Sequence, residues 1–156
     1  MRLRLIAVGT RMPAWVEAGF AEYAQRLPRE LKPELVEIPL QPRGKNADIA
    51  RLREAEGERT LRAVPDGARL IAFDEHGELL DTVAWSRAIQ QWQRDGRDVA
   101  LLVGGPDGLA PACRQQAAAC WSLSRLTFPH PLVRVLIAEQ LYRAWSLSTG
   151  HPYHRA

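Results

Sequence analysis

The chain has 156 residues, 46% of them hydrophobic and 25% charged, a composition that predicts one soluble globular domain spanning residues 1–156. Two cysteines without a Cys-x-x-Cys spacing exclude a disulfide framework and a zinc-ligand pattern, so we expect no metal and a reducing, cytoplasmic location. The N-terminal apolar run is too short for a signal peptide, no stretch reaches the length of a membrane span, and the net charge of +3 is compatible with an RNA partner.

The first part of the chain alternates predicted strands with predicted helices. Residues 3–10 form a short apolar run ending in Gly-Thr, which predicts a buried strand. Pro13 marks the expected start of a helix whose apolar residues keep helical spacing up to Leu27. Residues 34–40 alternate like a second strand, and Asn46 is expected to cap the next helix.

A small basic loop precedes that second helix. Residues 43–46 read Arg-Gly-Lys-Asn, a composition that suits a phosphate contact and equally suits a surface loop with no role. The helix itself carries charges of both signs, which is typical of a face exposed to solvent.

The middle of the chain continues the alternation. Residues 69–73 predict a third strand, closed by a polar turn at residues 74–77. Thr82 is expected to cap a helix that ends near Gly96. Residues 98–105 contain a continuous apolar run, as in a strand covered on both faces.

The C-terminal third contains the strongest helix signal. Residues 110–120 predict a short helix, and residues 121–131 predict either a fifth strand or an ordered loop. Residues 132–148 predict a helix that is apolar on more than one side. Such a helix lies either between the sheet and a second subunit or at the centre of a monomer. Glu139 and Arg143, four residues apart, are expected to pair.

Together these elements predict an α/β fold with a parallel-type sheet flanked by helices. Such sheets bind ligands at the carboxyl ends of their strands, where Gly9, residues 73–77 and residues 104–108 are expected. The last segment, Gly-Gly-Pro-Asp-Gly, lacks both the P-loop lysine and the dinucleotide fingerprint. Its adjacent glycines fit either a ligand close to the backbone or only a tight turn. Asp74 similarly suits a ribose hydroxyl or an Asx turn.

Chemistry-bearing side chains gather near the C-terminus. His130, His151 and His154 all lie there, with Tyr153 and Arg155 beside the last of them. Aromatic and imidazole rings stack on bases and arginine binds phosphate, which fits a nucleic-acid contact; a disordered end without a role is the alternative. A metal site is a third option, but the tail has no carboxylate that would complete it. No Gly-x-Ser-x-Gly motif is present, and both cysteines fall in or beside an alanine-rich segment typical of inert thiols.

Several motifs together resemble one known family. They are LIAVGT from residue 5, RGKNADI from residue 43, LLVGGPDGL from residue 101, FPHPLVRVLIAEQLYRAW from residue 128 and GHPYHR from residue 150. In these motifs the chain is similar to the large-subunit ribosomal RNA pseudouridine N3-methyltransferases, which are SPOUT-class enzymes that use S-adenosylmethionine. The resemblance covers essentially the whole chain.

This resemblance has implications for fold and partners. It implies an α/β fold whose C-terminal part is tied in a trefoil knot, an exception to the general rule against knots. It also implies a homodimer in which the knot holds the cofactor and the partner subunit completes the site. The implied substrate is a pseudouridine in a large-subunit RNA stem-loop within the assembled ribosome.

The resemblance also implies which residues contact S-adenosylmethionine. They are Phe73, Gly104, Leu123, Ser124, Arg125, Leu126, Thr127 and Phe128. Gly105 is added because a glycine gives a ligand access to the backbone. Phe73 and Phe128 replace residues that are commonly aliphatic in the family, so the pocket is expected to differ near them.

For catalysis we hypothesise that Tyr153, His154 and Arg155 complete the site over the cofactor of the other subunit. His154 is the expected base by residue type, and Arg155 would stabilise the developing anion or bind phosphate. His130 and Arg134, which flank residues 123–128, are the second candidates. Two rival functions remain: a SPOUT enzyme acting on another RNA base, and a non-catalytic RNA- or ribosome-binding module.

Overall fold

The computed structural model describes residues 1–154 and has a five-stranded parallel sheet at its centre, with strand order β2-β1-β4-β3-β5. The strands are β1 (Leu3–Val8), β2 (Glu34–Ile38), β3 (Arg69–Leu79), β4 (Val99–Val103) and β5 (Ala119–Ser122). The helices are α1 (Ala14–Ala24), the 3-10 turn η1 (Arg29–Leu31), α2 (Ile49–Arg62), α3 (Thr82–Asp95), α4 (Pro111–Gln116) and α5 (His130–Thr149). The predicted α/β class and its parallel sheet are confirmed.

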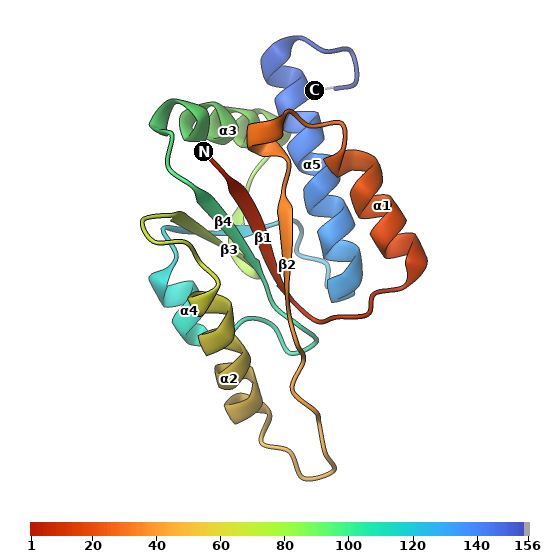
Figure 1. The fold of residues 1–156 in the computed structure, drawn as a ribbon, viewed down its shortest axis with the longest axis vertical. Coiled ribbons are helices and arrows are strands. Elements are labelled where there is room, and N and C mark those ends of the chain that lie inside the picture. Colours follow the sequence, from red (N-terminus) through yellow and green to blue (C-terminus); the bar gives the residue numbers. More distant parts are fainter. Residues whose placement is uncertain (155–156) are drawn as a thin grey trace.

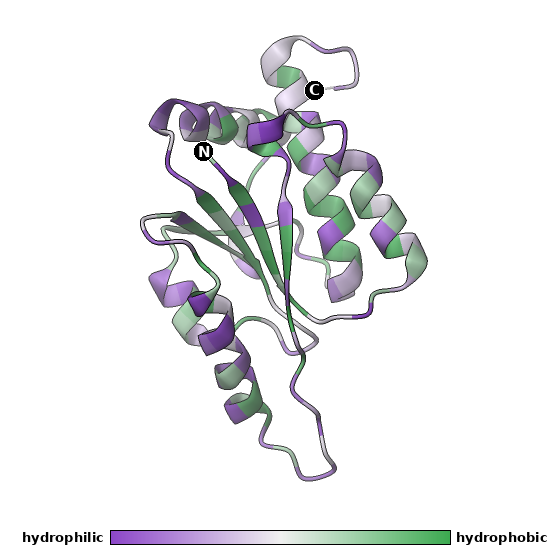
Figure 2. Cartoon of the chain, viewed as in Figure 1, coloured by the Kyte–Doolittle hydropathy of each residue, from purple (hydrophilic) through white to green (hydrophobic). Residues whose placement is uncertain are grey.

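The helices form a layer on each face of the sheet. Figure 1 shows α1, α3 and α5 on one side and α2 with α4 on the other. Each layer closes its own apolar core, and the two cores meet through the strands. All five residues of β4 are buried, as a strand at the centre of a sheet covered on both faces requires. Figure 2 accordingly shows the strands as the most consistently hydrophobic elements.

The predicted polar turn at residues 74–77 is wrong, because β3 continues to Leu79. The second part of β3 pairs only with β5, across a register shift between Phe73 and Glu78. Gly77 makes this pairing possible: a Cβ there would lie 2.7 Å from the backbone carbon of Trp121. This part of the strand projects beyond the buried sheet, so its side chains are polar and resemble those of a turn.

Several helix ends differ from prediction. Helix α1 ends at Ala24 rather than Leu27, and the helix expected over residues 110–120 ends at Gln116, because Ala119 and Cys120 pair with β3 as the start of β5. The Asp48 side chain accepts a hydrogen bond from the Arg51 amide, so Asp48 rather than Asn46 caps α2. Asp81 rather than Thr82 caps α3, through the Ala84 amide. Gly96 does end α3, with a φ of 76°. Within residues 121–131, the first two end β5, residues 123–129 form a loop, and the last two begin α5.

Helix α5 is the longest helix within residues 1–154. Its 20 residues span about 30 Å, since each residue of an α-helix adds about 1.5 Å. Its first turn lies near the carboxyl ends of the strands, and its last turn lies at the opposite end, next to the C-terminal tail (Figure 1). In residues 1–154 no helix combines the length and the hydrophobicity that a membrane crossing needs.

Candidate functional site

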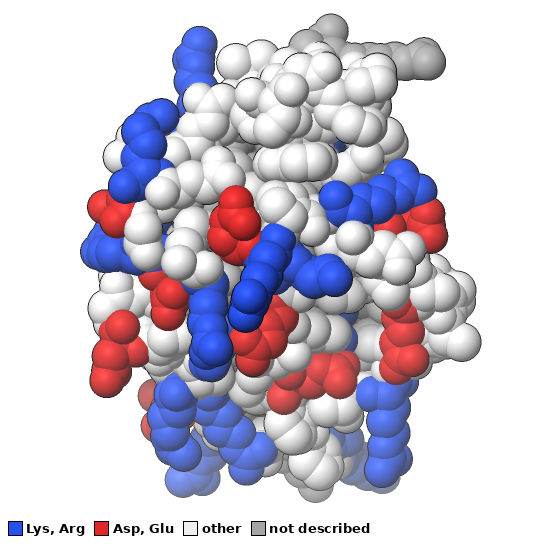
Figure 3. All heavy atoms as spheres, turned by 45° about the horizontal axis from the view of Figure 1, so that its top comes forward, with Lys and Arg blue, Asp and Glu red and all other residues white. Residues whose placement is uncertain are grey.

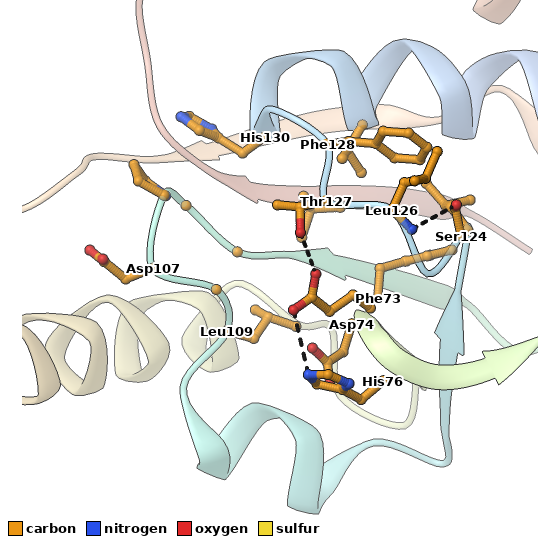
Figure 4. Close-up of a pocket in the computed structure, with 18 of the residues that line it drawn as sticks. Phe73, Asp74, His76, Asp107, Leu109, Ser124, Leu126, Thr127, Phe128 and His130 are labelled. Atoms are coloured by element: carbon orange, nitrogen blue, oxygen red, sulfur yellow. Dashed lines mark hydrogen bonds and ion pairs between the residues drawn. The ribbon is translucent and has the colours of Figure 1, made fainter.

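A cavity of about 450 Å³ opens at the carboxyl ends of β3 and β4. Three segments surround this cavity: residues 73–76 of β3, the turn of residues 104–109 after β4, and the loop of residues 123–128 with the start of α5 (Figure 4). We call the cavity the strand-end cavity and the turn of residues 104–109 the glycine turn. The volume falls in the range of about 300–1,000 Å³ typical of small-molecule sites.

Eight of the nine predicted cofactor-binding residues line the strand-end cavity. They are Phe73, Gly104, Gly105, Leu123, Ser124, Leu126, Thr127 and Phe128. The ninth, Arg125, uses its guanidinium elsewhere: Nη1 donates to the carbonyl oxygen of Gly77 at 2.8 Å and to that of Glu75. Arg125 therefore fastens the loop to β3.

The loop of residues 123–128 is held in place by its own polar side chains. Ser122 Oγ lies 3.0 Å from the Glu75 carbonyl oxygen and 2.8 Å from that of Ser124. The Leu126 amide donates to Ser124 Oγ at 3.0 Å, and Thr127 Oγ1 donates to Glu75 Oε2 at 2.9 Å (Figure 4). Since these contacts engage the polar groups, the apolar side chains of the loop are left to form the wall.

The glycine turn folds back tightly on itself. A Cβ on Gly104 would lie 2.3 Å from the backbone carbon of Gly108, whose amide donates to the Gly105 carbonyl oxygen at 3.0 Å. A Cβ on Gly105 would lie 3.0 Å from Val8 Cγ1. The turn itself thus explains Gly104, and packing against β1 explains Gly105. Both sequence interpretations, a tight turn and a ligand close to the backbone, fit the structure, because this turn is also a wall of the cavity.

Aromatic packing gives the cavity a rigid floor. Phe73 ends the apolar part of β3 and is 8% exposed. Its ring lies 5.8 Å from that of Trp85 and 6.1 Å from that of Trp121, between centroids. The face of Phe73 that reaches the cavity is therefore backed by large side chains from α3 and β5.

Polar residues at the rim were not among the predicted contacts. Asp74, Glu75, His76, Asp107 and Arg114 all line the cavity. His76 Nε2 lies 3.4 Å from Glu75 Oε1, and Arg114 Nη1 lies 4.0 Å from Asp74 Oδ2. The first three lie in β3 directly after its apolar part, Asp107 lies in the glycine turn and Arg114 lies in α4. The end of an apolar run was the signal in the sequence, and only Asp74 was weighed as a ligand contact.

His130 and Arg134 occupy different places. His130 lines the cavity, and its Nδ1 is buried without a hydrogen-bond partner among the described residues. Burial, and then the neighbouring Arg134 charge, lower the pKa of His130, so the ring is neutral at pH 7 and able to accept a proton. Arg134 is 1% exposed; it pairs with Glu37 at 2.6 Å and donates to the Gly9 carbonyl oxygen at 2.7 Å. Arg134 thus joins α5 to β2 and to the residue that follows β1, and it does not line the cavity.

The tail is attached to the far end of α5. The Tyr153 hydroxyl donates to Glu139 Oε1 at 2.9 Å, its ring centroid lies 4.5 Å from that of Tyr142, and the Arg143 guanidinium lies 5.1 Å from it. Burial and the Glu139 carboxylate raise the pKa of Tyr153 to about 12, so Tyr153 is protonated at neutral pH. The predicted pair Glu139–Arg143 is confirmed at 2.6 Å.

His154 ends the described chain, with its Nδ1 buried and without a partner within residues 1–154. Arg155, the third predicted tail residue, lies outside the described residues. The strand-end cavity lies at the first turn of α5, whereas the tail follows its last turn (Figure 1) and folds back as far as Glu139, in the middle of the helix. Glu139 and His130 are nine residues apart, about 14 Å along the helix, so the Tyr153 side chain lies away from the cavity of its own chain.

Comparison with known proteins identifies the family. The family model described as predicted SPOUT methyltransferase matches residues 1–154. The chain belongs to the SPOUT methyltransferase family. As a SPOUT methyltransferase, the protein uses S-adenosylmethionine as its methyl donor. It is 61% identical over 155 residues to ribosomal RNA large subunit methyltransferase H of Thioalkalivibrio sulfidiphilus (strain HL-EbGR7), a match that covers 99% of each chain.

Solved structures share the SPOUT fold at low identity. The probable methyltransferase from Bordetella pertussis Tohama I superposes with a TM-score of 0.56 at 16% identity, over 92% of this chain and 96% of that one. The probable methylase family protein from Haemophilus influenzae Rd KW20 superposes with a TM-score of 0.54 at 11% identity, over 99% and 70%. At these identities the likeness concerns the fold alone.

Proposed function

We propose that this SPOUT methyltransferase methylates N3 of a pseudouridine in a stem-loop of large-subunit ribosomal RNA, within the assembled ribosome. The observation that carries this proposal is the 61% identity, over nearly the full length of both chains, to a protein named ribosomal RNA large subunit methyltransferase H. A ribosomal substrate also agrees with the net charge of +3, and with such a substrate we propose a cytoplasmic location.

The strand-end cavity is the proposed binding site for S-adenosylmethionine. Its size suits a nucleoside with an amino-acid arm, and the floor at Phe73 with the wall at Leu109 and Phe128 offers apolar surface to an adenine ring. Asp74 stands where a carboxylate accepts hydrogen bonds from ribose hydroxyls. Gly104 and Gly105 line the cavity with backbone atoms, which a bound ligand can approach.

The chain must position the acceptor nitrogen and remove its proton. When bound, the cofactor would supply a methyl group on a positively charged sulfur, and the sulfur is the leaving group when the nitrogen takes the methyl group in line. The protein has to hold the reacting nitrogen within about 3–3.5 Å of that methyl carbon. We propose His154 of a second copy as the base, with Arg155 of that copy stabilising the anion. Tyr153, protonated and bonded to Glu139, would fix the direction of the tail. His130 is the base available within the same chain.

We further propose a homodimer with a knotted C-terminal part, as family membership implies. The dimer is supported by large apolar side chains left in solvent: Trp15 is 59% exposed and Leu126, at the cavity rim, is 70% exposed. Figure 3 shows positive and negative side chains interspersed over much of one face and few of either near the C-terminal end of α5. A second copy would cover these surfaces and bring its tail to the cavity.

The test is a methylation assay with labelled S-adenosylmethionine on ribosomes that carry or lack the pseudouridine. Label is expected only in large-subunit RNA of ribosomes that carry it, with naked RNA a poorer substrate. Equal labelling of both ribosomes would assign the enzyme to another base. If calorimetry detects no binding of S-adenosylmethionine, the remaining interpretation is a non-catalytic RNA- or ribosome-binding module.

A further inference from the structure

A buried carboxylate lies behind the glycine turn. Glu56, on α2, is 2% exposed. Arg43 meets it with two nitrogens: Nη1 lies 2.5 Å from Oε2 and Nη2 lies 3.1 Å from Oε1. The Gln41 amide adds a third hydrogen bond, to Oε2 at 2.9 Å. A buried carboxylate needs both a counter-charge and donors, and Arg43 supplies both with the geometry that suits a carboxylate.

The same guanidinium also holds Asp107, which lies in the glycine turn and lines the strand-end cavity. Arg43 Nη2 lies 2.9 Å and Nε 3.2 Å from Asp107 Oδ2. Arg53, one turn of α2 before Glu56, donates to the Asp107 carbonyl oxygen at 3.3 Å. Asp107 is thus bound to α2 and to the loop before it, across 64 residues of sequence.

Arg43 has no donor left for another ligand. A guanidinium has five N–H groups. In Arg43, Nε serves Asp107, Nη1 serves Glu56 and the Gln41 carbonyl oxygen, and Nη2 serves Glu56 and Asp107. Both carboxylates, Glu56 first, raise the pKa of Arg43, so its charge is permanent. These contacts argue against the phosphate-binding interpretation of Arg43 and leave Lys45 as the cation of that loop exposed to solvent.

We propose that Arg43, supported by Glu56, is a positioning residue that holds Asp107 and thereby keeps the glycine turn in the shape that binds S-adenosylmethionine. This inference rests on the proposed function, which places the cofactor in the strand-end cavity. The turn needs such a restraint because three of its residues, Gly104, Gly105 and Gly108, are glycines with wide backbone freedom. Fixing the turn before the ligand arrives removes an ordering cost from binding.

A double-mutant cycle on cofactor affinity tests the proposal. Arg43→Gln, Asp107→Asn and the double variant are compared with the wild type by calorimetry with S-adenosylmethionine. We expect each single change to raise Kd about tenfold and the double change to raise it no further, because both remove one restraint. Arg43→Lys keeps the positive charge beside Glu56 but lacks the paired N–H donors of a guanidinium. Its Kd should lie between those of the wild type and Arg43→Gln. In the assay, KM for the cofactor should rise while KM for ribosomes stays unchanged.

The ion pair Arg69–Asp95 is a matched control. It joins Nη2 to Oδ2 at 3.1 Å with side chains 28% and 32% exposed, against 2.9 Å, 20% and 32% for Arg43–Asp107. It links the start of β3 to the end of α3, away from the cavity. Arg69→Gln and Asp95→Asn should leave Kd for S-adenosylmethionine unchanged.

Three results would overturn the inference. The first is additive effects of the two changes, which would mean that Asp107 meets the cofactor directly and Arg43 does not act through it. The second is an unchanged Kd in the folded Arg43→Lys and Arg43→Gln proteins. The third is a wild-type protein that binds no S-adenosylmethionine, and this alone would overturn the proposed function as well.

Discussion

The two ends of α5 differ in what they are built to do. At the first turn, His130 borders an open cavity, and its pKa is lowered by burial and by Arg134. Beyond the last turn, the tail folds back so that Tyr153 is bonded to Glu139, in the middle of α5, and packed on Tyr142, and its pKa is raised. The first end therefore has space and a neutral imidazole, whereas the other carries a tail held against the helix. A single chain thus holds both parts of the proposed site and keeps them apart.

The largest expected effect separates these two ends directly. Truncation after Gly150 removes the tail and leaves the cavity end intact. We expect methyl transfer to fall by about 10²-fold or more, since a positioned acid or base contributes on the order of 10²–10⁴. Kd for S-adenosylmethionine should stay unchanged, which calorimetry checks. Full activity in the truncated enzyme would mean that the tail has no catalytic part and would leave His130 as the base.

A smaller effect concerns how the tail is attached. Tyr153→Phe removes the hydroxyl bond to Glu139 while keeping the ring on Tyr142, and it should cost about 1 kcal/mol of unfolding free energy at pH 7. Urea denaturation measures the difference. The raised pKa gives this contribution a pH dependence: it is complete below pH 10 and is lost as pH rises toward about 12, because the unfolded state loses the proton first. A difference between the two proteins that grows from pH 9 to pH 11 would contradict this account.

The sequence was sufficient for the order of elements and for the position of the cavity. Apolar runs separated by helical periodicity predict the parallel sheet and place a ligand site at the carboxyl ends of its strands. Gly105 follows from this pattern, whereas Phe73, Gly104 and the loop of residues 123–128 follow from the family resemblance. The sheet pattern is local in sequence, which is why it can be found without the structure.

What could not be predicted depends on contacts between distant segments. The polar end of β3 looks like a turn until Gly77 is seen against Trp121. Arg125 looks like a ligand contact until its bonds to β3 are seen. The Arg43–Asp107 pair joins residues 64 positions apart, and nothing near either residue in the sequence indicates its partner.

Mixed dimers test the central claim, that the tail of one copy completes the cavity of the other. One subunit is truncated after Gly150, and the other carries Thr127→Trp, which adds bulk at an exposed position in the cavity wall. Each variant alone should be inactive. Two affinity tags on co-expressed chains isolate the mixed dimer, which has one open cavity facing one intact tail. The account predicts about half of the wild-type rate, since one of two equivalent sites is restored. A mixed dimer as inactive as its parents would contradict it.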